Sequence, residues 1–560
     1  MVIVYATCLN DMKLRQSDLW DHVNYGRTMI AFKGLPKTEP LLVLSSDAPF
    51  VNPAWGSQVL MAACVDSPVL GLAGIQIGHG LLVLACLWVV GIAVLKKSES
   101  VCFAVLSAAA FLYVNWQQFL VARPQTLGVL LYTVLLVALS QRHDRHRLGQ
   151  VFIVAGFVAW ANLHGSFLLG LFLIGITGIG RFIDYSWRLR SVSKIWNRNL
   201  VKPLPSRRGQ LFVKVLNRSH FTRLLILGLC CAAAVLVNPS GLQIYREVFR
   251  ISGHPNMQSM IEWRSLSLSM KQGQAAAYVL AGVVVFCVFS KRRWGMPNPL
   301  LFLILGSLML WSSRMINWWA PVASYLVGIH GASTLNRFIP RLFPRSIQFL
   351  RSIQFLRSVQ TSRPESAVGS WWRSSCCVNM GIGVLTAVVI FTMSPLGQQT
   401  LGQQTLGRQV PDSELLEHRA PLELAAFVGQ HFAEQRTDLN PNSNPFDGMI
   451  FCPSSWAGYL MSVTRQTKHG EQTNPADLFP LQPLVNTHVH IIPPKVWHDF
   501  LTIDWARAES VSILQQYQID TVITDRRRHG RLEKLLQKSA QYKLFYSNSE
   551  GQIWRSTTSD

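Results

Sequence analysis

Residues 74–95 read GIQIGHGLLVLACLWVVGIAVL, an apolar run without a single Asp, Glu, Lys or Arg. The charged pair Lys96 and Lys97 follows it directly. The hydrocarbon core of a bilayer is about 30 Å thick, and a helix needs roughly 20 apolar residues to cross it. The stretch therefore predicts a membrane-spanning helix with a basic end.

Similar runs recur after this stretch and extend to residue 395. The further runs are 101–118, 125–140, 150–163, 165–181, 223–238, 274–290, 298–313, 315–332 and 377–395. Charged residues make up only 14% of the chain, against about 25% in soluble domains. We therefore expect an α-helical polytopic membrane protein with nine or ten transmembrane helices. The count stays open because residues 150–181 could form one re-entrant unit.

The net charge of +23 is concentrated in alternate loops between the predicted spans. These loops are 96–100, 141–149, 181–223, 291–297 and 333–377. They hold 26 of the 52 Lys and Arg residues but only four acidic residues, and so carry +22 of the charge. Such loops are cytoplasmic in multi-pass proteins. We therefore expect a multi-pass membrane protein with its C-terminal domain outside, and no nucleic-acid binding, because the basic residues are scattered between spans.

Composition divides the chain into four segments. They are an extracytoplasmic N-terminal segment at 1–71, a transmembrane helical domain at 72–395, a polar linker at 396–415 and an extracytoplasmic α/β domain at 416–560. The run from Met1 to Leu14 is too short to span and is no clear signal peptide. We interpret this as a missing first helix, with translocation of the tail without one as the alternative. Two tandem repeats, RSIQFL at 345–356 and LGQQT at 396–405, are interpreted as tolerated loop duplications.

The last segment mixes helical and strand-like patterns. Helices are expected at 421–432, 454–463, 511–517 and 532–538, and strands at 448–452, 484–492, 520–524, 543–547 and 552–555. Its single cysteine, Cys452, allows no internal disulfide, and the sequence has no CxxC pair for a thiolate zinc site. We therefore expect a small soluble α/β domain.

The stretch SDLWDHVNYGR, which begins at Ser17, holds the densest group of candidate catalytic side chains. Ser17 is a favourable N-cap for a helix. Such a helix places four side chains on one face, because they are three or four residues apart: Asp18, Asp21, His22 and Tyr25. It would lie along the membrane interface, with Asp18 and Asp21 directed toward a cavity as general bases or metal ligands. The alternative is a capped helix with a solvated acidic face.

Further polar residues gather at the expected outer ends of the spans, where their burial points to a site. Arg123, His164 and Arg314 are candidates for binding a phosphate, which fits the guanidinium fork. The other candidates are His22, Asn162, Asn238, Glu262 and Asn317. Snorkelling of the arginines and a packing role for the histidine are the alternatives.

The predicted strand 484–492 carries His488 and His490 on one face, with His498 nearby. This spacing could serve a metal pair, but the pattern is weak and we predict no metal site. We interpret WAGYL at 456–460 as a packing element and the basic stretch 526–531 as a solvated face.

Several motifs resemble those of a family of bacterial polytopic membrane proteins. They are DLWDHVNYGR (18–27), LPKTEP (35–40), FVNPAWGSQVL (50–60), ARPQTL (122–127), WANLHGSFLLG (160–170), LVNPSGLQIY (236–245), IEWRS (261–265), PSSWAGYL (453–460) and LQQYQIDTVIT (514–524). That family is placed near the GT-C membrane glycosyltransferases, similar to the dolichyl-phosphate-mannose and aminoarabinose transferases. The resemblance covers most of the chain and implies a GT-C-like fold.

The resemblance also implies a function. A sugar would be transferred from a polyprenyl-phosphate donor to an envelope acceptor at the outer face of the inner membrane. GT-C enzymes carry a functional Asp in the first outer loop, a place that Asp18 matches and Asp21 follows. Asp18 would be the base or a metal ligand, while Arg123, His164 and Arg314 would bind the donor phosphate. The implied partners are a lipid-linked sugar donor and membrane lipid; protein partners are unknown, and a divalent cation stays open as a cofactor.

Two other functions remain open. A transporter or channel would place ionisable residues at mid-membrane and repeat its helices, whereas the polar residues here lie at span ends. A non-catalytic scaffold or assembly protein would bind its partner through the outer α/β domain and would not need Asp18.

Overall fold

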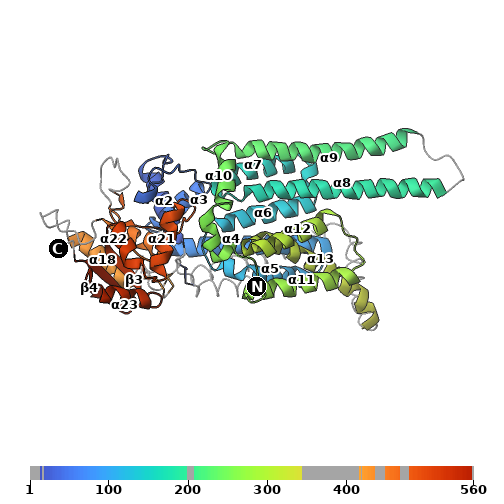
Figure 1. The fold of residues 1–560 in the computed structure, drawn as a ribbon. Coiled ribbons are helices and arrows are strands. Elements are labelled where there is room, and N and C mark those ends of the chain that lie inside the picture. The colour runs from blue at the N-terminus through green and yellow to red at the C-terminus, as the bar shows by residue number, and fades with distance from the viewer. Residues whose placement is uncertain are drawn as a thin grey trace, which may run out of the picture.

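The structure is a computed structural model that describes residues 13–15, 18–198, 207–342, 415–417, 419–434, 448–466 and 478–557. A bundle of long helices lies beside a smaller domain built on a mixed sheet (Figure 1). The N-terminal helices α2 (Leu19–Ala31) and α3 (Trp55–Val65) lie between these two parts and contact both. The short 3-10 helix η1 (Val43–Ser45) lies between them in the sequence.

Within the described residues, nine of the ten predicted spans coincide with helices. They are α4 (Gly71–Ser98), α5 (Val101–Phe119), α6 (Gln125–Ser140), α7 (Arg147–Leu163), α8 (Phe167–Arg198), α9 (Arg207–Val235), α11 (Lys271–Phe289), α12 (Pro297–Trp311) and α13 (Ile316–Leu342). Residues 150–181 thus belong to two separate helices. The tenth predicted span, 377–395, and both tandem repeats lie outside the described residues.

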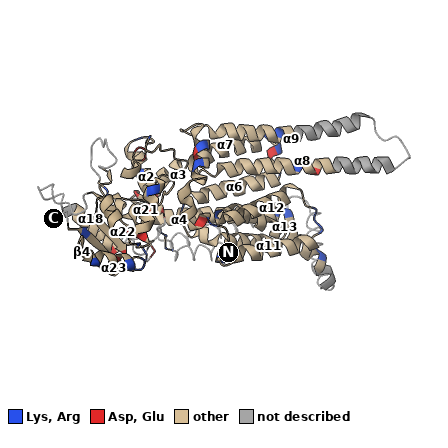
Figure 2. Ribbon diagram, viewed as in Figure 1, with Lys and Arg blue, Asp and Glu red and all other residues tan. Residues whose placement is uncertain are grey.

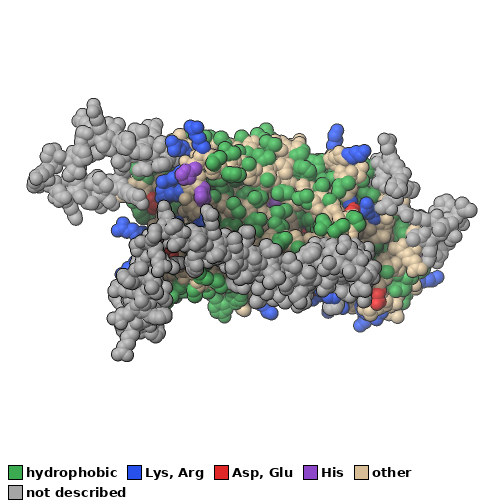
Figure 3. Space-filling view, turned by 180° about the vertical axis from the view of Figure 1, so that it is seen from behind, with side chains coloured by type: hydrophobic (Ala, Val, Ile, Leu, Met, Phe, Trp, Pro, Cys, Tyr) green, Lys and Arg blue, Asp and Glu red, His purple; other side chains and the backbone are tan. Residues whose placement is uncertain are grey.

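The surface of the bundle is apolar between its two ends. Four described helices, α4, α5, α8 and α11, are long and apolar enough to cross a membrane. Large hydrophobic side chains such as Trp88, Leu229 and Leu303 are more than half exposed, and Figure 3 shows a band of hydrophobic side chains along the bundle. Because a band of this extent would be unfavourable in water, the chain is an α-helical multi-pass membrane protein, as predicted.

The basic loops gather at the end of the bundle away from the α/β domain (Figure 2). Lys97 Nζ donates to the carbonyl oxygen of Ser140 at 3.3 Å, and Arg292 Nη1 donates to that of Lys97 at 3.3 Å. Arg181 pairs with Asp144, in the 3-10 helix η2 (His143–Arg145), at 2.6 Å. These contacts join loops that the charge pattern places together, so the helices alternate in direction as the sequence predicts.

The C-terminal domain contains a five-stranded sheet in the order β2-β1-β3-β5-β4. Its strands are β1 (Met449–Phe451), β2 (Gln482–Pro483), β3 (Ile519–Asp525), β4 (Tyr542–Ser547) and β5 (Gly551–Ser556). β1 is parallel to β2 and β3, and β5 is antiparallel to β3 and β4. Its helices are α18 (Leu422–Glu434), α19 (Ser454–Val463), α21 (Pro494–Asp504), α22 (Ser510–Gln516) and α23 (Gly530–Lys538). The α/β prediction is confirmed.

One prediction about this domain is wrong. Residues 484–492 form a loop and no strand: Asn486 Oδ1 accepts from the backbone N–H of His488 at 2.9 Å, and a turn follows at 489–491. The basic stretch 526–531 is exposed as predicted, except for one residue. His529 is 1% exposed and lies 3.1 Å from Asp504, which also pairs with Arg528.

Helix α2 packs between α3 and α19 at unusually short range. A methyl group on Gly26 would lie 2.6 Å from the carbonyl carbon of Gln58. One on Gly458 would lie 2.7 Å from the backbone nitrogen of Asp21. Asn24 Nδ2 adds a hydrogen bond to the Gly458 carbonyl at 2.8 Å. The interpretation of WAGYL as a packing element is therefore confirmed.

Helix α2 is buried on nearly every side, so the prediction that it lies along the membrane interface is wrong. Leu19, Val23 and Asn24 are completely buried, and Asp21 is 2% exposed. The helix therefore does not lie along a membrane interface with a solvated or cavity-facing side. It begins directly after Asp18, and Ser17 lies outside the described residues.

Short elements close the end of the bundle that faces the α/β domain. They are α10 (Gln243–Ser252), η3 (Pro255–Ser259), η4 (Ile261–Trp263) and η5 (Ser313–Met315). Asn256 fixes this layer to the domain, because its Nδ2 donates to the carbonyls of Val489 and Ile492, both at 2.8 Å. The predicted site residues lie in and around this layer.

Candidate functional site

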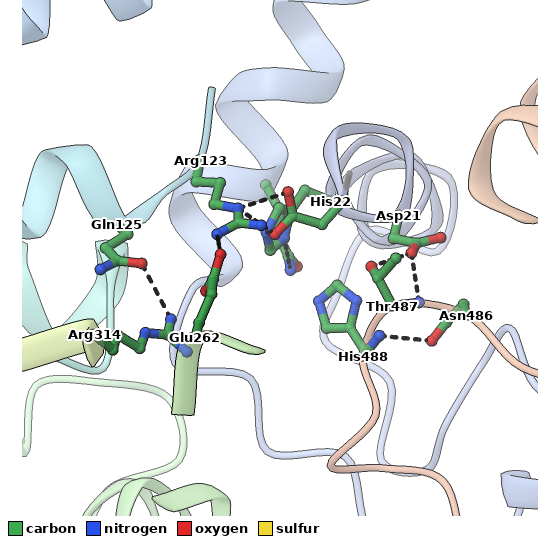
Figure 4. A network of polar contacts seen from close by, with 11 residues as sticks. Asp21, His22, Arg123, Gln125, Glu262, Arg314, Asn486, Thr487 and His488 are labelled. Atoms are coloured by element: carbon green, nitrogen blue, oxygen red, sulfur yellow. Dashed lines mark hydrogen bonds and ion pairs between the residues drawn. The ribbon is translucent and has the colours of Figure 1, made fainter. Parts of the chain in front are cut away.

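Asp18, Arg123 and Glu262 form one ion-pair cluster between three separate parts of the chain (Figure 4). Arg123 Nε lies 2.8 Å from Asp18 Oδ2, and Arg123 Nη1 lies 2.5 Å from Glu262 Oε1. Asp18 precedes α2, Arg123 lies between α5 and α6, and Glu262 lies in η4. The two carboxylates raise the pKa of Arg123 above its ordinary value against the effect of burial. The sequence predicted these residues at one end of the bundle.

Arg314 is a second cation beside this cluster. Its Nη2 donates to Gln125 Oε1 at 3.2 Å, and its guanidinium lies 5.4 Å from the ring centroid of Trp263. Among the described residues no carboxylate lies within 4 Å of it. Burial lowers its pKa, and the neighbouring Glu262 only partly offsets this. A partly buried guanidinium without its own counter-ion is a candidate anion site.

His22 and His164 are neutral hydrogen-bonding groups at this cluster. His22 Nδ1 accepts from Gln58 Nε2 at 3.0 Å, and its Nε2 lies 3.8 Å from Asp18. Burial lowers the pKa of His22 to about 4. His164 Nδ1 accepts from the backbone N–H of Ser166 at 3.1 Å, and burial with repulsion from Arg314 lowers its pKa to about 3. Neither side chain supplies a positive charge to a phosphate at neutral pH.

Asp21 lies on the other side of α2 and faces the α/β domain. Its Oδ2 accepts a 2.9 Å hydrogen bond from the backbone N–H of Thr487 and another from the Thr487 hydroxyl. Its Oδ1 is buried and has no hydrogen-bond partner among the residues that the structure describes. Burial raises the pKa of Asp21 to about 7, although both bonds from Thr487 lower it. The predicted acidic face is thus divided between two surroundings.

Tyr25 lies on the same side of α2 as Asp21 and belongs to a buried group of hydrogen-bonded side chains that the sequence did not reveal. Its hydroxyl donates to Glu39 Oε1 at 2.7 Å and accepts from Asn486 Nδ2 at 3.4 Å. Burial raises the pKa of Glu39 to about 7. LPKTEP contains Glu39, but nothing in its sequence pattern pairs it with Tyr25. This group joins α2 to the C-terminal domain.

Three of the predicted site asparagines have structural partners. Asn238 Nδ2 donates to the Ala161 carbonyl at 2.8 Å, and Asn162 Oδ1 accepts from Trp55 Nε1 at 2.9 Å. Asn317 Nδ2 donates to the carbonyl of Arg314 at 3.2 Å, and so supports the η5 turn that presents Arg314. The first two connect α7 to its neighbours and do not reach the ion-pair cluster through any described contact.

His488 and His490 come close to the site without forming a strand face. The His488 ring packs on the rings of His22 and Tyr25 at 4.9 and 4.7 Å, and lies 5.8 Å from His490. His498 is 72% exposed beside Asp499 on α21. Within the described residues no three His, Cys, Asp or Glu side chains are grouped to hold a metal.

A divalent cation does not fit the ion-pair cluster as it stands. Asp18 and Glu262 are its carboxylates, and both are already bound by the Arg123 guanidinium. A cation would have to displace that guanidinium and meet its repulsion. The arrangement can instead hold an anion at Arg314, which lies near Arg123 and Glu262 (Figure 4), and Asp18, bound to Arg123, offers a carboxylate at the same cluster.

Comparison with known proteins defines the fold class. No protein-family model and no curated protein matches the chain. The archaeal oligosaccharyltransferase AglB from Archaeoglobus fulgidus, in complex with an inhibitory peptide and a dolichol-phosphate, is similar with a TM-score of 0.50 and 11% identity. That similarity covers 100% of this chain and 74% of AglB. ArnT from Cupriavidus metallidurans, bound to undecaprenyl phosphate, has a TM-score of 0.43 and 13% identity to this chain. That comparison covers 99% of this chain and 96% of ArnT.

The similarity to AglB shows a shared fold. The chain has the GT-C-like fold that its motifs predicted, with a bundle of membrane helices and a C-terminal α/β domain.

Proposed function

We propose that this chain is a membrane glycosyltransferase that moves a sugar from a polyprenyl-phosphate donor to an acceptor of the cell envelope. The observation that carries this proposal is Arg314, a cation without a described carboxylate partner, beside the cluster of Asp18, Arg123 and Glu262. A charge placed like this is costly unless an anion completes it. The GT-C-like fold agrees with the proposal.

Arg314 and Arg123 would hold the donor phosphate. The Trp263 ring and the Gln125 amide fix the Arg314 guanidinium, so little conformational freedom is lost when the anion binds. Neutral His164 can donate through its Nε2 atom, because its Nδ1 atom accepts from Ser166.

Asp18 would act as the general base. The acceptor hydroxyl attacks the anomeric carbon of the sugar, Asp18 takes the hydroxyl proton, and the bond from that carbon to the phosphate oxygen breaks. Its electron pair stays on the lipid phosphate, where the two arginines stabilise the added charge. A positioned base contributes typically 10²–10⁴-fold to such a step. Asp21, bound by Thr487, would position α2 rather than touch substrate.

We place this site at the outer face of a bacterial inner membrane. The basic loops lie at the opposite end of the bundle (Figure 2), and an excess of Lys and Arg marks the cytoplasmic side. The α/β domain would then be extracytoplasmic. The experiment below identifies the sugar by its mass.

The test is deletion of the gene followed by rescue with the natural chain, Asp18→Asn or Asp66→Asn, with envelope glycans measured by mass spectrometry. Asp66 is the matched control, since it also pairs with a mostly buried arginine, Arg27, at 2.6 Å, but lies outside the cluster. We expect one sugar to disappear on deletion and to return with the natural chain and Asp66→Asn only. Full rescue by Asp18→Asn would overturn the assignment of Asp18.

A non-catalytic scaffold is the second candidate, and one observation favours it. Both oxygens of Asp18 lie within 2.9 Å of Arg123 Nε, so the proposed base is already paired. A scaffold keeps this pair permanently, whereas a transferase must loosen it when the donor phosphate arrives. An unchanged glycan profile after gene deletion would support the scaffold.

A further inference from the structure

A second collection of cations lies at the far end of the bundle, away from the proposed transferase site. Lys97, Lys291, Arg292 and Arg337 line an open hollow of about 340 Å³ there. They come from the end of α4, the α11–α12 connection and the end of α13. Three segments far apart in the sequence thus direct four positive charges to one place.

No carboxylate neutralises these four side chains among the described residues, where none of them takes part in an ion pair. Basic loops usually send their side chains out to water, where like charges separate. Here the ends of α4, α11 and α13 hold them around one hollow. Their mutual repulsion remains unless an anion enters.

The two arginines are held in place by backbone carbonyls. Arg292 Nη1 donates to the carbonyl of Lys97 at 3.3 Å, and Arg337 Nη1 donates to that of Phe289 at 3.2 Å. Arg337 Nε is buried and has no hydrogen-bond partner within the described part of the chain. The remaining guanidinium N–H groups are therefore available to a ligand with several oxygen acceptors.

We propose that this hollow binds a phosphate group, and that the group is the headgroup phosphate of an anionic membrane lipid. Fixed guanidinium groups and lysines recognise phosphate oxygens by charge and by paired N–H donors. A lipid is favoured over a free phosphate compound because apolar side chains are exposed on the adjoining helix ends. Val101 on α5 is 67% exposed, and Val288 on α11 is 69% exposed. A lipid chain can lie along these side chains while its headgroup enters the hollow.

The test uses the full chain in nonionic detergent and three versions of it. The pocket variant is Lys291→Gln with Arg292→Gln. The matched control is Lys96→Gln with Arg145→Gln, which removes the same charge from exposed residues outside the hollow. Arg337 is left unchanged in both, because its buried Nε atom makes its replacement a risk to folding. Melting without added ligand shows whether each version is folded.

Each version is titrated with phosphatidylglycerol, with phosphatidylcholine and with inorganic phosphate, and bound lipid is counted by native mass spectrometry. We expect phosphatidylglycerol to bind the natural chain and the control at least tenfold more tightly than the pocket variant, with no such difference for phosphatidylcholine. A difference seen with inorganic phosphate alone would support the phosphate site but assign it to a free phosphate compound. Equal binding of both anions by all three versions would overturn the proposal. This result is independent of the glycan experiment, because the two sites lie at opposite ends of the bundle.

Discussion

Arg123 Nε lies 2.8 Å from Asp18 Oδ2, although 105 residues separate the two in the sequence. The contact connects the start of α2 to the loop between α5 and α6. Because the same guanidinium also holds Glu262, three otherwise distant segments depend on one side chain. The cluster is therefore both a structural joint and the proposed site.

Replacing Arg123 by Met should destabilise the chain more than replacing Asp18 by Asn. The first change removes the guanidinium that binds both Asp18 and Glu262, whereas the second leaves Arg123 bound to Glu262. Removing one partner of a buried pair costs about 3–5 kcal/mol, and less where a second partner remains. Thermal melting in detergent should rank the natural chain above Asp18→Asn and Asp18→Asn above Arg123→Met. The reverse order of the two variants would mean that Arg123 is not the centre of the joint.

If the proposed function holds, Arg314→Gln should weaken binding of a polyprenyl phosphate by about 10–100-fold, the loss expected for a hydrogen bond to a charged group. Stability should change little, because Arg314 has no ion pair to lose among the described residues. Arg250→Gln is the control, since Arg250 pairs with Glu247 at 2.7 Å in the same layer. Binding is followed by native mass spectrometry. Equal loss in both variants would indicate a general charge effect and not a phosphate contact.

Asp21 should make the chain less stable as the pH rises. Burial raises the pKa of Asp21 to about 7 in the folded chain, above the ordinary value of 3.8, so the folded state binds the proton more tightly. The stabilisation is complete below pH 3.8 and is lost as the pH rises through about 7. Between pH 5 and pH 8 the natural chain should lose about 2–3 kcal/mol more than Asp21→Asn, which keeps an acceptor for Thr487 without a charge. Parallel melting curves for the two proteins across this range would show that Asp21 is not protonated in the folded chain.

His22 should make the chain less stable as the pH falls, the opposite of the effect of Asp21. Burial lowers its folded pKa to about 4 from 6.5, so its contribution is complete above pH 6.5 and is lost as the pH falls through about 4. The groups that face it are Asp18, Gln58, Arg123 and His488. Between pH 7 and pH 5 the natural chain should lose about 2 kcal/mol more than His22→Gln. A His22→Gln variant that is equally sensitive to acid would rule out this histidine as the cause.

Gly458→Ala should destabilise the chain by disturbing the close packing of α2 on α19. The added methyl group would lie 2.7 Å from the backbone nitrogen of Asp21 and still closer to its Oδ1, and such overpacking costs about 1–3 kcal/mol. Gly429→Ala, in α18, is the control, because its nearest described neighbour would lie at an ordinary 3.5 Å. We expect a lower melting temperature for Gly458→Ala alone. A control that melts as early would point to helix α18 and not to the contact with α2.

The sequence predicted the helices and the end of the bundle at which the site lies. Both depend on patterns that a bilayer imposes, namely the length of apolar runs and the alternation of basic loops. Asp18, Arg123, Glu262 and Arg314 could therefore be assigned to one end from charge and span order alone. The distances between them could not, because they depend on how η4 and η5 fold over the bundle.

The sequence did not predict the partners of Asp21. Helical spacing put Asp21 on the same face as Asp18, yet the two face different neighbours, since α2 is enclosed by α3 and α19 on opposite sides. The sequence predicts a strand through Asn486 and Thr487, because Val485, Val489 and Ile491 are separated by even numbers of residues. The apolar residues of 484–492 instead enter different cores, with Val489 in the sheet domain and Ile491 beside Met29. Tertiary contacts of this kind override local periodicity.

The hydrogen bond between Asp21 and Thr487 spans 466 positions of the chain. At a synthesis rate of about 5–20 residues per second, the ribosome needs roughly 25–90 s to reach the second residue after making the first. During this time Leu19 and Val23 have no α19 to cover them, and every bundle helix between must be inserted. The packing around α2 is thus completed only after the α/β domain that follows the bundle has been made.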